Sequence, residues 1–126
     1  LGIMNYLWSM CTSQITKTIH LVLKHKWYDM IESGEKPEEY RECTEYWIKR
    51  LLLGTKCIFA PARQSIRQKL PIKDGMTVTF HRGYTSTTMT FKVDFLLYGH
   101  GVPQWGAPKE KCFIIKLGKR LENGEI

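Results

Sequence analysis

The sequence predicts a single α+β domain, with a small mixed β-barrel or curled sheet and two helices near its N-terminus. Its 126 residues, 43% hydrophobic and 25% charged, suit one globular domain, since single domains cluster at roughly 100–150 residues. Two segments with helical periodicity come before residue 54, and most strand-like segments come after it. A strand-rich second half after one early strand and two helices is typical of a small curled sheet or barrel.

The first half of the chain is expected to contain one strand and two helices. Residues 18–24 (TIHLVLK) are rich in branched apolar side chains and predict a strand. Apolar residues three and four apart predict a short helix over 26–33, and Gly34 can end it in the left-handed conformation. Thr44 can cap a second helix that ends near Gly54. The apolar stripe of this second helix consists of Trp47, Ile48, Leu51 and Leu52.

Between the two helices lies a charged segment, residues 35–42 (EKPEEYRE). Pro37 disfavours a helix there and favours extended geometry in the residue before it. In an extended segment Glu39 and Arg41 share one face, and Tyr40 lies on the other. We expect this segment to be too charged to form a core element.

The second half is expected to be mostly strand. Residues 54–75 contain the glycines and prolines of a loop, with a short helical turn expected within 64–70. Residues 100–108 (HGVPQWGAP) predict a loop around Trp105, and a polar tail follows the last strand. Alternating or branched apolar residues predict three strands, over 76–83, 87–98 and 112–117. The aromatic residues in periodic segments, Trp27, Trp47 and Phe91, are predicted to be core residues.

Positive charge is concentrated in the later part of the chain. The formal net charge is +7, and residues 46–126 hold fourteen of the nineteen basic and five of the twelve acidic side chains. Residues 49–73 contain seven basic residues and no acidic one, which favours a polyanionic partner because basic side chains release counterions from phosphates. A solvated face that aids solubility is the alternative. The candidate nucleic-acid contacts, which include one residue from a later strand, are Lys49, Arg50, Arg63, Arg67, Lys69 and Arg82.

Several other classes of protein are not supported by the sequence. The four cysteines include no C-x-x-C pair, so we expect reduced thiols, several of them buried. The four histidines have no metal-ligand spacing and no phosphate-binding glycine motif occurs, so we expect no metal and no cofactor. No apolar run approaches ~20 residues, and no basic region precedes the apolar N-terminal segment. We therefore expect a cytoplasmic protein with no membrane partner.

The segment that begins at Gly34 reads G-x-K-x-x-E-x-R. This motif resembles the signature of the ASCH (activating signal cointegrator homology) family, which belongs to the PUA-like superfamily. The strand HLVLK before it, the helix EYWIKR after it, and the later WGA loop and CFIIKLGK strand fit the same family. The resemblance covers residues 18–119. Residues 1–17 are then expected to be an N-terminal extension, of which residues 1–3, before Met4, are left over from cloning. Residues 120–126 are expected to be a C-terminal tail.

The resemblance implies a small PUA-like β-barrel with a cleft that is lined by the motif and binds RNA or a nucleotide. Lys36, Glu39 and Arg41 would face this cleft. One enzymatic branch of the superfamily, the small N4-acetylcytidine amidohydrolases, has a threonine at the position of Glu39. This chain therefore lacks the hydroxyl nucleophile of that branch.

The residue types of the motif also suit a ligand independently of the resemblance. Arg41 can hold an anion as a planar fork, and Lys36 can do so as a point charge. Glu39 can accept a hydrogen bond from the exocyclic amine of a base or act as a general base. A structural ion pair between Glu39 and Arg41 is the alternative. Trp105 can either stack on a base or fold back as a lid on the barrel mouth.

The sequence thus predicts an RNA- or nucleotide-binding module that uses a basic surface and the motif cleft. Its partner would be RNA, another single-stranded nucleic acid or a nucleotide-like small molecule. The alternative is a hydrolase of a modified nucleoside or RNA, in which Lys36 and Glu39 form the catalytic pair and activate a water. The candidate ligand-binding residues are Lys36, Glu39, Arg41 and Trp105.

Overall fold

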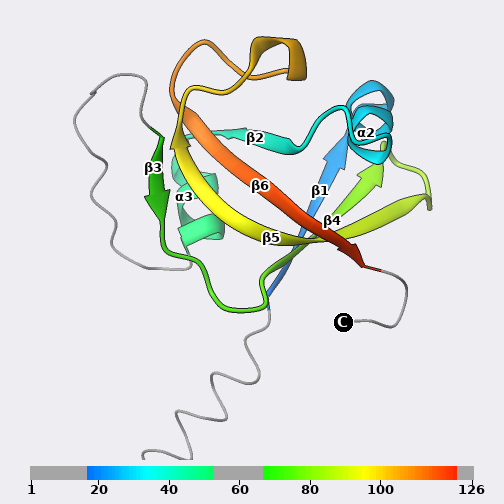
Figure 1. The fold of residues 1–126 in the computed structure, drawn as a ribbon, viewed down its shortest axis with the longest axis horizontal. Helices are drawn as coiled ribbons and strands as arrows, with labels where there is room; N and C mark the ends of the chain where they lie inside the picture. Colours follow the sequence, from blue (N-terminus) through cyan, green and yellow to red (C-terminus); the bar gives the residue numbers. More distant parts are fainter. Residues whose placement is uncertain (1–16, 53–66, 122–126) are drawn as a thin grey trace, which may run out of the picture.

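The computed structural model describes residues 17–52 and 67–121 and has an α+β fold, as the sequence predicts (Figure 1). Two helices accompany a curled mixed sheet that forms a half-barrel. In chain order the elements are β1 (Thr18–Leu23), α2 (His25–Glu32), β2 (Glu38–Glu42), α3 (Glu45–Leu52), β3 (Gln68–Leu70), β4 (Thr77–Arg82), β5 (Thr88–Gly99), the 3-10 helix η1 (Pro103–Trp105) and β6 (Cys112–Leu121).

The sheet has six strands, of which five follow one path in the order β1-β4-β5-β6-β2, while β3 pairs with β5. β1 and β4 run parallel, and the other pairs are antiparallel. The β5–β6 register shifts on both sides of Val93, and such irregularities bend a strand. The resulting curl brings the outer strands β1 and β2 near each other, since Arg41 Nη2 on β2 donates to the Val22 carbonyl on β1 over 3.4 Å.

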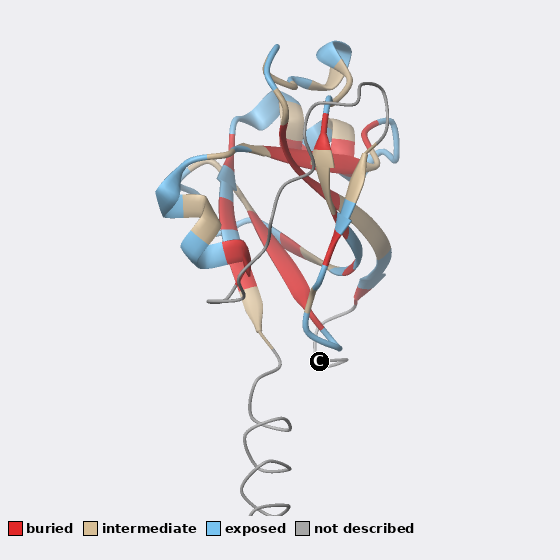
Figure 2. Ribbon diagram, turned by 90° about the vertical axis from the view of Figure 1, so that its left-hand side faces the viewer, coloured by how far each residue is buried: buried red, intermediate tan, exposed pale blue. Residues whose placement is uncertain are grey.

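The hydrophobic core lies between the curled strands and the helices (Figure 2). Burial alternates along β1, so that every second side chain points inward, as expected for a strand with one buried face. The helices contribute Tyr28 and Ile31 from α2, and Leu51 and Leu52 from α3. Full burial of one large apolar side chain stabilises the folded state by about 1.5–3 kcal/mol. Trp47 and Phe91 are half-buried and pack against this core.

The signals that end and begin the helices are where the sequence predicts them. Gly34 follows α2 with φ at +88°, a conformation that disfavours residues with a Cβ. The Thr44 hydroxyl accepts a 3.4 Å hydrogen bond from the Trp47 backbone N–H in the first turn of α3, which is the role of an N-cap. These two turns frame the segment that carries the motif.

Three details differ from the sequence prediction. The strand expected over 112–117 continues to Leu121, because Leu121 is buried and pairs with Thr90. A helical turn is wrong for residues 68–70, which form β3 and pair with β5. The charged segment 35–42 was expected outside the core, yet Glu38 and Glu39 are only 1% and 4% exposed. Glu38 is neutralised by cations from other parts of the chain, and Glu39 by Lys36 and Arg41 of the segment itself.

Several expectations concern residues outside the described ranges. They include the extension over 1–16, the end of the second helix near Gly54, Arg63, and the tail from residue 122. Within the described ranges, no helix combines the length and the hydrophobicity that a membrane span requires.

Candidate functional site

A cleft of about 450 Å³ lies between the outer strands β1 and β2, which do not pair with each other. Its walls come from the end of β1, both helices, β2 and the loop after η1. The lining residues are Val22, Leu23, Lys24, Trp27, Glu39, Tyr40, Arg41, Glu42, Trp47, Gly106 and Pro108. The gap in the half-barrel thus contains two of the predicted ligand-binding residues, Glu39 and Arg41.

Lys36, the first charged residue of the motif, is buried beside the cleft. Its side chain is 1% exposed, and its Nζ lies 2.8 Å from Glu39 Oε1. Nζ also donates to the Trp105 carbonyl oxygen over 2.6 Å. It lies 4.5 Å from the ring centre of Trp27 and 5.4 Å from that of Tyr40, within cation–π range. Lys36 therefore ties α2, β2 and η1 together.

Arg41 is anchored from several sides but keeps unused donors. Its Nη1 donates to Glu39 Oε2 over 2.8 Å and to the Tyr40 carbonyl over 2.7 Å, and its Nη2 donates to the Val22 carbonyl over 3.4 Å. A guanidinium has five N–H groups, so the Nε–H and one N–H of Nη2 have no partner among the described residues. The side chain is 18% exposed. Arg41 can therefore donate two hydrogen bonds to a ligand from a fixed position.

Two tryptophans border the same cleft from different helices. Trp27 on α2 and Trp47 on α3 are both half-buried. The guanidinium carbon of Arg41 lies 5.3 Å from the ring centre of Trp47. Gly106, with φ at +90°, packs on Trp27 so closely that an added Cβ would lie 2.9 Å from the indole. The loop after η1 thus depends on a glycine to approach the Trp27 wall.

A second hollow of about 390 Å³ adjoins the cleft and shares Glu42 and Pro108 with it. Its other lining residues are Cys43, Thr44, Tyr98, Glu110 and Lys111. Lys111 Nζ lies 5.9 Å from the ring centre of Tyr98. Together the two hollows give room for more than one planar group.

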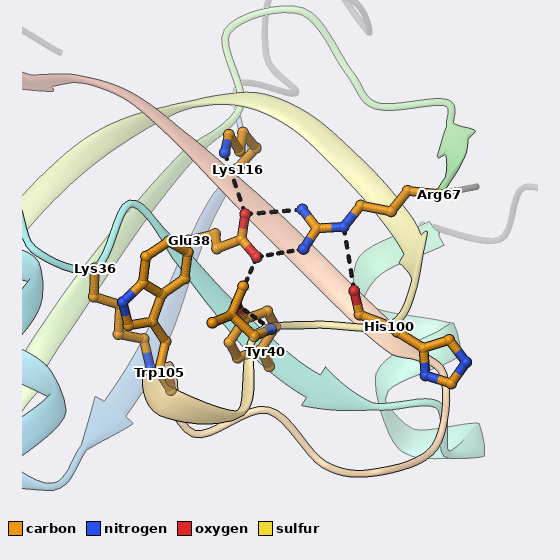
Figure 3. A network of polar contacts seen from close by, with 8 residues as sticks. Lys36, Glu38, Tyr40, Arg67, His100, Trp105 and Lys116 are labelled. Atoms are coloured by element: carbon orange, nitrogen blue, oxygen red, sulfur yellow. Dashed lines mark hydrogen bonds and ion pairs between the residues drawn. The ribbon is translucent and has the colours of Figure 1, made fainter. Parts of the chain in front are cut away.

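On the other face of β2, Glu38 is the centre of a separate polar network (Figure 3). Arg67 binds its carboxylate in a bidentate manner, with two hydrogen bonds of 2.9 Å. Lys116 Nζ lies 3.2 Å from Oε1, and the Tyr40 hydroxyl donates to Oε2. The Tyr40 hydroxyl in turn accepts the Val102 N–H over 3.0 Å. This network joins β2 to β6, to the start of β3 and to the loop before η1.

The two titratable groups at the centre of this network have opposite pKa shifts. Burial acts to raise the pKa of Glu38, but hydrogen bonds from Arg67, Tyr40 and Lys116 outweigh it and hold this pKa below the ordinary value. Burial and the hydrogen bond to Glu38 raise the pKa of Tyr40 far above its ordinary value. Tyr40 therefore remains a protonated donor and Glu38 an ionised acceptor.

The basic residues predicted to bind nucleic acid lie in different environments. Lys49 and Arg50 are exposed on α3 and line a hollow with Lys17 and Tyr46. Arg67 is part of the Glu38 network. Lys69 Nζ lies 4.4 Å from the ring centre of Phe95. Arg82 forms an ion pair with Asp29, with 2.9 Å between Nε and Oδ1. Arg63 lies outside the described residues.

Trp105 and the motif ion pair correspond to the alternatives that the sequence left open. Trp105 is half-buried and packs against the buried cluster formed by Tyr40, Cys112 and Ile114. Its backbone carbonyl accepts a hydrogen bond from Lys36, which in turn pairs with Glu39 of the cleft. The ion pair between Glu39 and Arg41 is present at 2.8 Å.

The sequence predicted Trp27 and Trp47 as core residues but did not predict that they border the cleft. Trp47 does both, since it also packs against the hydrophobic core. The helices of the two tryptophans immediately flank the motif in the sequence, and this order was the available signal that their side chains could border it.

Comparisons with protein-family models, curated proteins and solved structures give no match. Function is therefore inferred from the geometry of the cleft. That geometry suits a planar group, which can stack on an indole and accept hydrogen bonds from Arg41.

Proposed function

We propose that this chain is an ASCH-type binding module in which the β1–β2 cleft holds a base of single-stranded RNA. The observation that carries the proposal is Arg41, next to Trp27 and Trp47: it is fixed by protein contacts, yet two of its N–H groups have no partner in the part of the chain that the structure describes. Stacking of a base on an aromatic side chain contributes about 1–3 kcal/mol. A prepositioned guanidinium adds directional hydrogen bonds to a base edge or a phosphate.

The charges of the cleft favour a base over a phosphate as the enclosed group. Lys24 and Arg41 are balanced by Glu39 and Glu42 among the lining residues. An uncharged planar group has little to lose in such a neutral cleft, whereas a phosphate would be close to two carboxylates. The basic excess of residues 46–126 would then attract the RNA backbone over a wider surface.

The adjoining hollow supports an RNA strand over a free mononucleotide. It continues from the cleft at Glu42 and Pro108 and offers Tyr98 and Lys111 to a second unit. A neighbouring base could pack on the Tyr98 ring while Lys111 lies near its phosphate.

The buried state of Lys36 supports binding over hydrolysis. A catalytic acid or base must come within hydrogen-bond reach of the substrate. Lys36 is 1% exposed and already bonds Glu39 and Trp105. Glu39 is 5% exposed at its side chain and has a cation on each oxygen. The pair is therefore better suited to holding Arg41 in place than to activating a water.

The proposal is tested by measuring the affinity of the full chain for a short labelled RNA of mixed sequence. Trp27→Leu and Arg41→Gln should each weaken binding by about 5- to 100-fold, the range expected for one stacking or charged contact. Tyr84→Ala is the matched control, because Tyr84 is 99% exposed on the β4–β5 turn and should leave the affinity unchanged.

Two outcomes would contradict the proposal. Binding that is as sensitive to Tyr84→Ala as to Trp27→Leu would show that the cleft is not the binding site. Hydrolysis of an N4-acylated cytidine, abolished by Glu39→Gln, would favour the enzyme instead.

A further inference from the structure

Two histidines on the surface of the sheet lie unusually close together and do not line the cleft. His20 Nδ1 on β1 is 3.0 Å from His81 Nε2 on β4. Their ring centres are 5.3 Å apart and the ring planes are tilted by 44°. His20 is exposed and His81 is half-buried. Both facing nitrogens are therefore on a solvent-accessible face of the protein.

The parallel pairing of β1 and β4 fixes this arrangement. His20 pairs with Thr79, and Val22 pairs with His81, so the two imidazoles are diagonal neighbours on the same face. Hydrogen bonds between threonine hydroxyls occur on this face as well, at 2.8 Å between Thr18 and Thr77 and at 2.8 Å between Thr79 and Thr90. The backbone positions of both histidines are thus held by paired strands.

We propose that His20 and His81 form a two-histidine binding site for a divalent transition metal ion of the copper(II) or nickel(II) type. Imidazole nitrogen is a good ligand for these ions, and square-planar or tetragonal geometry is typical of them. The proposal does not depend on RNA binding. Because the two residues are far apart in the sequence, no ligand spacing could have indicated the site.

The nitrogen–nitrogen distance indicates the class of metal. With metal–nitrogen bonds of roughly 2.0–2.1 Å, a separation of 3.0 Å corresponds to an angle at the metal of roughly 91–97°. This is the angle between neighbouring ligands in square-planar or octahedral coordination. A tetrahedral zinc ion would need a separation of roughly 3.3–3.4 Å, so the site has to open before it fits zinc.

Metal binding requires a change of tautomer in one of the two rings. In the hydrogen-bonded pair, one facing nitrogen carries a hydrogen and the other presents its lone pair. When the donor ring carries its hydrogen on its other nitrogen, both facing nitrogens present lone pairs, and rotation of the rings directs them at one ion. Among the described residues, no group of three His, Cys, Asp or Glu side chains could hold a metal. Water or an external ligand would then have to fill the remaining coordination positions.

The test is a calorimetric titration of the tag-free full chain with Ni²⁺, repeated with Zn²⁺. We expect one equivalent of Ni²⁺ to bind, more tightly than Zn²⁺. His20→Asn and His81→Asn should each lower the Ni²⁺ affinity more than about tenfold. Mutating a residue that only hydrogen-bonds to a metal ligand already lowers metal affinity about 10- to 100-fold, and removing a ligand should cost at least as much. His100→Asn, at an exposed histidine in a loop, is the matched control and should bind Ni²⁺ as the wild type does.

Circular dichroism establishes that the variants are folded, so that a loss of binding is interpretable. The proposal is overturned if no single-equivalent site is found, or if either variant keeps the wild-type affinity. Tighter binding of Zn²⁺ than of Ni²⁺ at the same two histidines would overturn the choice of metal class.

Discussion

Lys36 offers the most demanding test of how the motif is built. Lys36→Met keeps the length of the side chain but removes the ammonium from a site where it is 1% exposed. Breaking a buried ion pair from one side costs about 3–5 kcal/mol, because it leaves an uncompensated charge. Glu39 keeps Arg41 as a partner at 2.8 Å, so we expect the lower end, about 3 kcal/mol. For a domain of this size that corresponds to a fall in Tm of roughly 10 °C.

The assay is urea unfolding followed by circular dichroism, with Lys26→Met as the matched control. Lys26 Nζ lies 4.7 Å from the same Trp27 ring but its side chain is exposed, so its loss should change the unfolding free energy by less than about 0.5 kcal/mol. The double variant Lys36→Met/Glu39→Gln should be destabilised by at least about 1 kcal/mol less than the sum of the single variants. Equal effects of Lys36→Met and Lys26→Met would refute the buried ion pair.

Three further predictions concern the loop after η1, the Glu38 network and a buried thiol. Gly106→Ala should weaken RNA binding and lower the unfolding free energy by about 1 kcal/mol or more, because φ is +90° and Trp27 blocks the added Cβ. The RNA-affinity and urea-unfolding measurements check this, and unchanged RNA binding would contradict the role of the Trp27 wall. The lowered pKa of Glu38 stabilises the folded state above the ordinary value of 4.5, and this contribution is lost as the pH falls through the folded-state pKa. Urea unfolding between about pH 3 and 7 should therefore show a steeper acid loss of stability for the wild type than for Glu38→Gln, and parallel profiles would refute it. Burial raises the pKa of Cys112 to about 11. With Cys11, Cys43 and Cys57 replaced by serine, Cys112 should therefore react with a thiol reagent at pH 8 more than about 100-fold more slowly in the folded than in the unfolded chain; comparable rates would contradict its burial.

The order of elements could be predicted from the sequence because it depends on local signals. Apolar spacing locates α2, alternation locates β4, and Gly34 and Thr44 mark the turns around the motif. The extended conformation of the motif, with Glu39 and Arg41 on one face, also follows from local geometry. Within the candidate site, these local rules were enough to place Glu39 and Arg41 in the same cleft.

The burial of Glu38 could not be predicted, because its partners come from distant parts of the chain. Glu38 is neutralised by Arg67 and Lys116, which follow it by 29 and 78 residues. A basic side chain such as Arg67 looks the same in the sequence whether it is solvated, bound to RNA or paired with a buried carboxylate. Only the β2–β6 pairing and the position of β3 decide between these roles.

The alternation of β2 divides its two buried carboxylates, Glu38 and Glu39, between two tasks. Glu38 points to one side, where Arg67 and Lys116 bind it and fasten the strand to the sheet. Glu39 points to the other side, where Lys36 occupies one oxygen and Arg41 the other. Since side chains alternate strictly along a strand, a register shift of one residue would exchange these faces. The Glu38 network therefore does more than stabilise the fold: by fixing the register of β2, it sets the direction in which Arg41 offers its free donors to the cleft.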